Sequence, residues 1–95
     1  MSVARIGQFH AHAGQEEALL AFLTTVVAPA IRAAAGNESA AVFQSLADPT
    51  VFTVIEVWAD VAAHRASVQH IPPEMIQQVM PLLAAPPTGD YYQPR

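Results

Sequence analysis

The chain has 95 residues, no cysteine, a formal net charge of −4, and a composition that is 53% hydrophobic and only 13% charged. These values allow one domain over residues 1–95 and exclude disulfides, thiolate catalysis and iron–sulfur clusters. The acidic balance without any basic cluster argues against nucleic acid as a partner. No apolar run approaches the roughly 18 residues of a membrane span, so no membrane contact is expected.

Residues 2–13 predict a first strand, because β-compatible residues alternate along it. One face carries Val3, Arg5, Gly7 and Phe9, and the other carries Ala4, Ile6, Gln8, His10 and His12. This beginning lacks the apolar core and cleavage site of a signal peptide. Together with the missing cysteines, it leads us to expect a cytoplasmic protein.

A helix is predicted from about Gln15, after a turn at Gly14. Its apolar stripe has helical spacing and consists of Leu19, Phe22, Leu23, Val26 and Val27. Pro29 predicts a kink or a restart, since proline has no backbone N–H to donate. Gly36 predicts the end of the helix.

Two strands follow as a hairpin, the first over residues 39–47 and the second from Thr50 to Trp58, joined by the turn signal Asp48-Pro49-Thr50. Asp60 is a suitable N-cap for a short helix over residues 61–69. Ile71-Pro72-Pro73 breaks that helix, and another begins at Pro73 or Glu74 and ends near Pro81. After a loop over residues 86–89, a short last strand is expected over residues 90–93.

The resulting order, β-α-β-β-α-β, predicts an α+β ferredoxin-like fold with helices on one face of an antiparallel sheet. Alternation puts Phe52, Val54, Glu56 and Trp58 on one face of the third strand and Val51, Ile55 and Val57 on the other. Both faces are apolar, so both need a cover, and the helices supply only one. We therefore expect a homodimer built through the face of Val51, Ile55 and Val57.

Glu56 and Trp58 are the first candidates for a site, because a carboxylate in an apolar strand is costly unless paired. Glu56 is interpreted either as an acid or base with a raised pKa or as a structural carboxylate held by neighbours. Trp58 is interpreted either as core or as a flat wall for a planar ligand.

The histidines offer a general base, His70 before the Pro-Pro break or His10 on the first strand, although each is also compatible with a capping or surface role. His10 and His12 alone are too few ligands for a catalytic zinc, so no metal is predicted. The chain has no lysine and no Gly-rich nucleotide turn. These absences predict that no cofactor is bound.

The pattern E-x-W-x-D-x-x-A in EVWADVAA, followed by His70, resembles the antibiotic biosynthesis monooxygenase family. The resemblance includes Gly14 before the first helix and the segment IPPEMIQQVMPLL, and so extends over most of the chain. It implies a dimeric α+β barrel in which the sheets of two subunits meet. It also implies a cofactor-independent monooxygenase that uses molecular oxygen on a small hydroxylated aromatic, of the quinol or anthrone type.

Under this resemblance His70 or His10 is the base, and Trp58, Phe22 and Phe52 form the pocket wall. Glu56 either orients the base or holds the polar network of the pocket. Haem-degrading relatives use an asparagine in the first strand, and the matching position here is Gly7, which argues against haem degradation. Two alternatives stay open. One is a non-catalytic module that binds an apolar ligand or haem, and the other is an accessory dimer without a ligand.

Overall fold

The computed structural model describes residues 1–95 and has the predicted order of elements. The strands are β1 (Val3–His10), β2 (Asn37–Gln44), β3 (Val51–Trp58) and β4 (Thr88–Tyr92). The helices are α1 (Glu16–Phe22), α2 (Ala28–Ala33), α3 (Val61–Val68) and α4 (Pro73–Val79), with a π-helical turn over Leu23–Val27 and a 3₁₀ turn over Met80–Leu82. No helix has the length and hydropathy needed to span a membrane.

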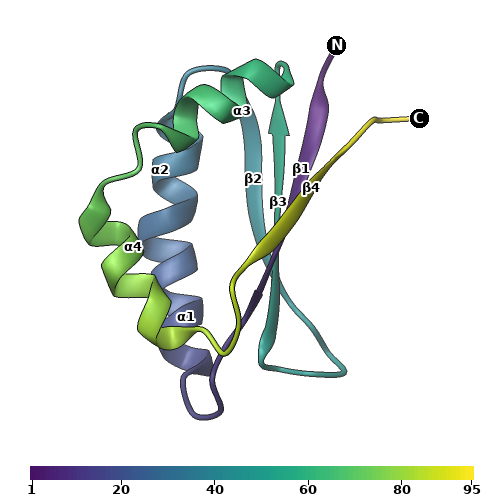
Figure 1. The fold of residues 1–95 in the computed structure, drawn as a ribbon. Coiled ribbons are helices and arrows are strands. Elements are labelled where there is room, and N and C mark those ends of the chain that lie inside the picture. Colours follow the sequence, from purple (N-terminus) through teal and green to yellow (C-terminus); the bar gives the residue numbers. More distant parts are fainter.

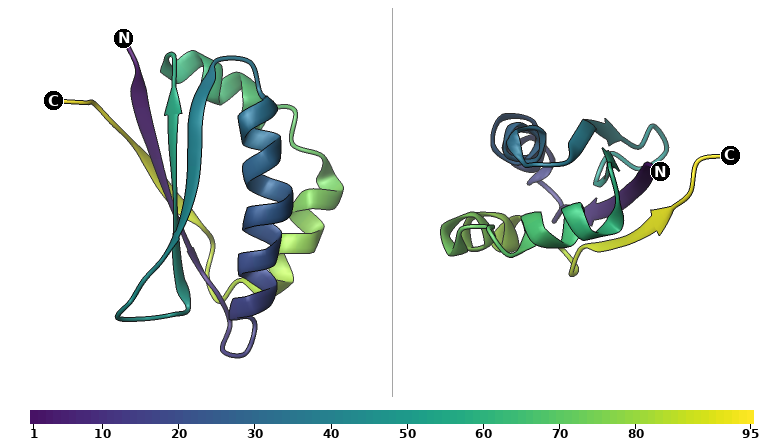
Figure 2. Two further views of the ribbon diagram at one scale, coloured as in Figure 1. Left: turned by 180° about the vertical axis from the view of Figure 1, so that it is seen from behind. Right: turned by 90° about the horizontal axis from the view of Figure 1, so that it is seen from above.

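The four strands form one antiparallel sheet in the order β2-β3-β1-β4. All helices lie on the same side of this sheet, and the opposite side is bare, as both views in Figure 2 and the view in Figure 1 show. The predicted ferredoxin-like α+β fold is therefore confirmed. We call the two sides of the sheet the covered face and the open face.

The first helix is interrupted where proline makes it necessary. Pro29 has no N–H for the carbonyl of Thr25, and the chain makes a wide turn just before it, in which the Ala28 amide bonds to the Leu23 carbonyl. The hydroxyls of Thr24 and Thr25 donate to carbonyls of the preceding turn, at 2.8 and 2.6 Å. The widened turn brings Val27 toward the covered face, where it packs on the core.

The predicted turn and cap between the later elements are confirmed. Asp48 accepts hydrogen bonds from the amide and the hydroxyl of Thr50, at 3.0 and 2.6 Å, and this closes the β2–β3 hairpin. Asp60 accepts from the Ala63 amide at 2.7 Å and starts α3. Gly36 has a φ of 85°, and a side chain there would collide with Ala63.

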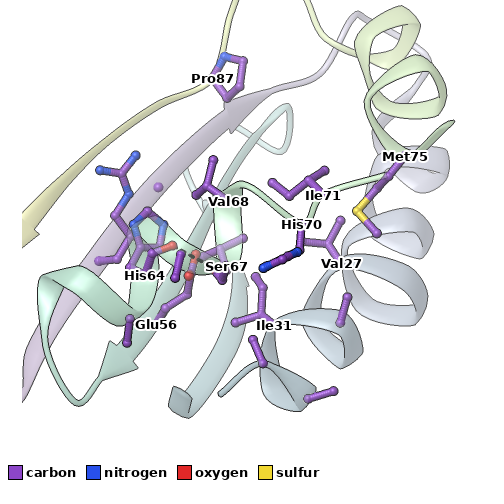
Figure 3. Close-up of a pocket in the computed structure, with 18 of the residues that line it drawn as sticks. Val27, Ile31, Glu56, His64, Ser67, Val68, His70, Ile71, Met75 and Pro87 are labelled. Atoms are coloured by element: carbon purple, nitrogen blue, oxygen red, sulfur yellow. Dashed lines mark hydrogen bonds between the residues drawn. The ribbon is translucent and has the colours of Figure 1, made fainter. Parts of the chain in front are cut away.

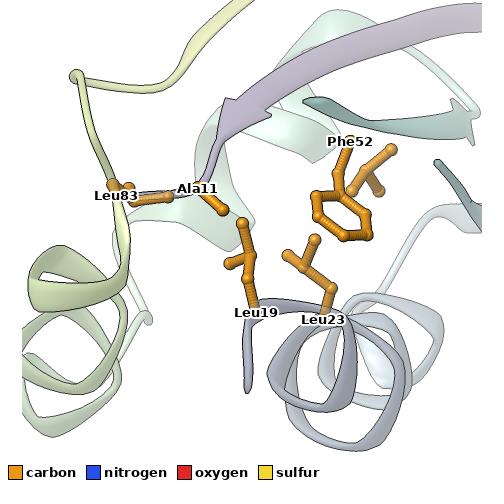
Figure 4. Packing of buried hydrophobic residues seen from close by; sticks show 6 residues of the cluster. Ala11, Leu19, Leu23, Phe52 and Leu83 are labelled. Carbon is orange, nitrogen blue, oxygen red and sulfur yellow. The ribbon is translucent and has the colours of Figure 1, made fainter. Parts of the chain in front are cut away.

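The hydrophobic core lies between the covered face and the first helix (Figure 4). Its buried members are Ala11, Leu19, Leu23, Phe52, Val54 and Leu83. Along β3 the burial alternates without a fault, with Phe52, Val54, Glu56 and Trp58 buried and the residues between them half-buried. The alternation fixes which side chains of β3 reach the space under the helices.

Candidate functional site

A cavity of about 570 Å³ lies between the covered face and the helices, beside the core. Its apolar wall comes from the π-helical turn, α2, α3, α4 and the segment between α3 and α4 (Figure 3), and includes Val27, Ile31, Val68, Ile71 and Met75. This volume is within the range of small-molecule sites, which have volumes of roughly 300–1,000 Å³. The cavity can therefore hold a compact, largely apolar ligand.

The floor of the cavity is set by strand register. Arg5 of β1 pairs with Glu56 of β3 and with Tyr91 of β4, so three polar side chains form one row across the covered face. Arg5 and Glu56 of this row line the cavity. The neighbouring row is almost bare, since Gly7 pairs with Val54 and with Gly89. A polar row beside a flat apolar floor gives the cavity two chemically different ends.

Glu56 lines the cavity and is only 8% exposed. The indole N–H of Trp58 donates to its Oε1 at 2.9 Å. Burial raises the pKa of the Glu56 carboxyl above its usual range, and the Trp58 hydrogen bond and the Arg5 charge oppose this effect without cancelling it. Glu56 therefore holds a proton more readily than a surface glutamate, as an acid or base in a cavity requires.

His64 of α3 lines the same end of the cavity and is 8% exposed. Its Nδ1 lies 2.6 Å from the Tyr91 hydroxyl, and its ring packs edge-on against Trp58 and Tyr91. Burial, followed by the charges of Arg5 and Arg65, lowers the pKa of His64. Burial thus favours the neutral imidazole, and the Tyr91 hydroxyl and the two packed rings fix its orientation.

Two of the six predicted site residues reach the cavity. His70 lines it from the segment after α3, and Glu56 lines it from β3 (Figure 3). Trp58 does not line the cavity, because its indole is completely buried beside Glu56 and His64. These two residues separate the indole from the cavity. The structure therefore brings His70 and Glu56 to one cavity and makes Trp58 the support of Glu56.

The other three predicted residues lie elsewhere. Phe52 is buried in the hydrophobic core, and Phe22 is half-buried on α1, outside the cavity lining. His10 is exposed and pairs with Val51, so its side chain is on the open face. No group of three or more His, Cys, Asp or Glu side chains is arranged to hold a metal ion.

Sequence reasoning missed Arg5 and His64 as site residues, and it weighed Tyr91 only as a hydrogen-bonding group for a ligand or as an anchor of the C-terminal tail. One available signal was the alternation of β1, which puts Arg5 on the same face as Gly7 and Phe9. The other was the Asp60 cap, which fixes the start of α3 and leaves His64 buried one turn later. Tyr91 had no such signal, because its place depends on the pairing of β4 with β1 at the far end of the chain.

Comparison with known proteins gives a family and a set of solved structures. The family model described as "Antibiotic biosynthesis monooxygenase" matches residues 2–78. No protein in a curated collection matches the chain.

Among solved structures, a candidate antibiotic biosynthesis monooxygenase from Bordetella bronchiseptica superposes with a TM-score of 0.86 at 21% identity, covering 99% of this chain and 97% of that one. A second such candidate, from Chloroflexus aurantiacus, has a TM-score of 0.76 at 28% identity, covering 100% and 94%. A protein from Pseudomonas aeruginosa has a TM-score of 0.78 at 28% identity, covering 99% and 95%. The similarity at 21% identity supports the fold alone.

Proposed function

Because this chain belongs to the antibiotic biosynthesis monooxygenase family, we propose that it is a cofactor-independent monooxygenase that oxidises a small hydroxylated aromatic compound with molecular oxygen. The family match and the named neighbours support a monooxygenase-like function. The substrate class, a quinol or an anthrone, and the independence from a cofactor are parts of the proposal.

The observation that carries the proposal is the cavity with one polar and one apolar end. An aromatic body fits the apolar wall of Val27, Ile31 and Met75, and a hydroxyl group fits the end with Glu56 and His64. A cavity of about 570 Å³ has room for a fused aromatic ring system.

In the proposed mechanism the protein supplies a base and binds the substrate, and the substrate anion itself reduces oxygen. A base removes a proton from the substrate hydroxyl or the activated carbon, and the resulting electron-rich anion gives an electron directly to oxygen. Recombination of the carbon radical with superoxide forms a C–O bond and gives a peroxide on carbon. Protonation of this peroxide and loss of the second hydrogen of the same carbon break the O–O bond, so one oxygen atom stays on carbon and the other leaves as water. For a CH₂ group that becomes a carbonyl, the substrate supplies both hydrogens of that water, so no external reductant is needed.

His70 and Glu56 are the proposed bases, since both line the cavity. The raised pKa of Glu56 suits a carboxylate that must take up a proton from the substrate. Trp58 would hold Glu56 in place through its N–H. His10 is on the open face and does not line the cavity, so it is not the base of this site.

The protein is also proposed to be a homodimer through the open face. The support is the half-buried apolar row of Val51, Ile55 and Val57, to which the exposed rings of Phe43 and Tyr92 add apolar surface. An obligate interface of this kind would bury at least about 2,000 Å². Such a dimer would join the two sheets and leave a cavity in each subunit.

The test is oxygen uptake by the purified protein with a panel of quinols and anthrones, together with its absorption spectrum and a haem titration. The proposal expects uptake that saturates with substrate, increases with pH as the substrate hydroxyl ionises, and needs no added cofactor. Glu56→Gln should lower the rate, and the exposed Glu38→Gln should leave it unchanged. Uptake no faster than the buffer control across the panel would contradict catalysis and favour a binding module with the same cavity.

A further inference from the structure

Arg5 is at the centre of the polar row, yet the mechanism above gives it no task. Its neighbours across the strands are Glu56 on β3 and Tyr91 on β4, and its side chain lines the cavity. It is also one of only four basic residues in the chain, which has no lysine. A cation among so few deserves a physical explanation at this position.

The position of the guanidinium is fixed by two residues of β4. A side chain added at Gly89 would put its Cβ 2.5 Å from one terminal nitrogen, Nη2, and 2.7 Å from Cζ of Arg5, so the guanidinium lies directly against the bare backbone of Gly89. The same group lies over the Tyr91 ring, with Cζ 5.0 Å from the ring centroid. Gly89 provides the space, and Tyr91 provides a surface that favours a cation.

The donors of Arg5 are not used by the protein. A guanidinium has five N–H donors, and no hydrogen bond joins those of Arg5 to another group of the chain. Arg32 shows the contrast, because its Nε and Nη2 both donate to the Ala40 carbonyl, at 3.2 and 2.8 Å. Arg5 is thus a positioned cation with free donors on a cavity wall.

We propose that Arg5, held by Gly89 and Tyr91, is the anion-binding group of the cavity and selects ligands that carry an ionised oxygen, such as a phenolate, an enolate or a carboxylate. The proposal rests on the proposed function for the identity of the site, but the binding preference needs no turnover. The ionised oxygen accepts from the guanidinium, and the aromatic body lies toward Val27 and Ile31.

A simpler role for Arg5 would be to offset the charge of Glu56, its neighbour on β3. The geometry argues against this as its main task, since the guanidinium extends toward β4, on the side away from Glu56. The Arg5 charge is also the smallest of the influences on Glu56, after burial and the Trp58 hydrogen bond. If Arg5 binds anions, an anionic ligand binds more tightly than a neutral ligand of the same shape. If Arg5 only offsets the charge of Glu56, the two ligands bind equally, so binding measurements distinguish the two roles.

Two probes of nearly equal shape, 2-naphthoate and 2-naphthalenemethanol, are compared by calorimetric titration at pH 8. Neither probe carries a quinol or anthrone group, so the titration measures binding and no oxidation. Wild type should bind the anion at least about tenfold more tightly than the neutral alcohol, the effect expected of a charge-assisted pair of hydrogen bonds. Arg5→Gln should abolish this preference and change the affinity for the alcohol by less than about twofold.

Gly89→Ala is the second variant, because it keeps the charge of Arg5 and displaces the guanidinium. Alanine is compatible with the backbone there, since Gly89 has no positive φ. It should reduce the anion preference at least about threefold. The control is Arg65→Gln, which removes a cation from an exposed position on α3 and should leave the preference intact.

Equal binding of both probes by wild type, failure of wild type to bind 2-naphthoate, or an unchanged preference in both Arg5→Gln and Gly89→Ala would each overturn the proposal. Far-ultraviolet circular dichroism and urea midpoints verify that the variants are folded. Failure of the oxidation proposal looks different. In that case the anion preference and its dependence on Arg5 persist, and oxygen uptake is absent.

Discussion

Both faces of β3 are largely apolar, but their surroundings differ. On the covered face Phe52, Val54 and Trp58 are 0–1% exposed and enclose the one buried carboxylate of the strand, Glu56. On the open face Val51 and Val57 stay half-buried, because no element of the chain covers them. The apolar surface of the covered face therefore builds the core and the cavity, and that of the open face is the surface proposed to meet a second copy.

The groups suited to catalysis and the groups suited to association lie on opposite sides of the sheet. The buried polar groups are on the covered face, where low dielectric raises the pKa of Glu56 and lowers that of His64. The open face carries exposed aromatic side chains, such as Phe43 at 53% exposure and Tyr92 at 52%. Changes on the covered face should alter turnover and intrinsic stability, and changes on the open face should alter association.

The largest effect is expected from the base. Replacing a working general base lowers the rate by about 10²–10⁴-fold, so His70→Ala on the covered face should reduce turnover of an accepted substrate by this factor. An equal loss of turnover in His10→Ala would mean that the base lies on the open face, and the assignment of catalysis to the cavity would be wrong. Full turnover in both variants would leave Glu56 as the first candidate. Steady-state oxygen uptake measures all three.

Stability should distinguish neighbouring residues on opposite faces. Phe52→Ala should lower the free energy of unfolding by about 3–5 kcal/mol, because the ring is fully buried in the core and leaves a cavity behind. Val51→Ala, one residue earlier on the open face, should cost about 1 kcal/mol or less in the isolated subunit. Urea unfolding at low protein concentration measures both, and equal losses would mean that the faces do not differ.

Association should respond to the open face alone. Val57→Asp puts a charge in the proposed interface and should convert a dimer into monomers or unfold it, because an unpaired buried charge is costly. Gln77→Asp adds the same charge to an exposed position of α4 and should leave the dimer intact. Light scattering at micromolar concentration reports the mass. A monomeric mass for the wild type would contradict the dimer.

The smallest effect is the pH dependence of stability contributed by Glu56. Its pKa is higher in the folded than in the unfolded chain, so its contribution to stability is fully present below the unfolded value and is lost as pH rises through the folded one. The stability of wild type relative to Glu56→Gln should therefore decrease as pH rises above the unfolded value, which is about 4.3 for glutamate. A relative stability that increases with pH would contradict the burial of Glu56.

The fold could be predicted because its signals are local. The Asp48-Pro49-Thr50 turn, the Asp60 cap and the alternation of β3 each determine a segment, and the order of segments determines the fold. Pro29 predicted an interruption of the first helix, and the structure has a π-helical turn before it. The covered face of β3 was identified correctly because side chains alternate along a strand. The structure buries Phe52, Val54, Glu56 and Trp58 and leaves the residues between them half-buried.

The site was only partly predictable because it depends on long-range register. Arg5 meets Glu56 and Tyr91 only through the pairing of β1 with β3 and β4, and no local pattern fixes that pairing. His64 reaches Tyr91 from a helix 27 residues earlier in the chain. Trp58 was expected at the cavity wall, and a pattern of alternation does not reveal that Glu56 and His64 lie between the indole and the cavity.

Monooxygenation in the cavity can be measured with 1,8-dihydroxyanthrone, the purified protein and ¹⁸O₂, followed by mass spectrometry of the quinone. We expect saturable turnover without added cofactor, one ¹⁸O atom in each product molecule, and consumption of one O₂ per anthrone. The rate should be well above that of the spontaneous reaction in buffer. A product without ¹⁸O, or formation no faster than in buffer, would contradict the claim that the cavity on the covered face carries out a monooxygenation.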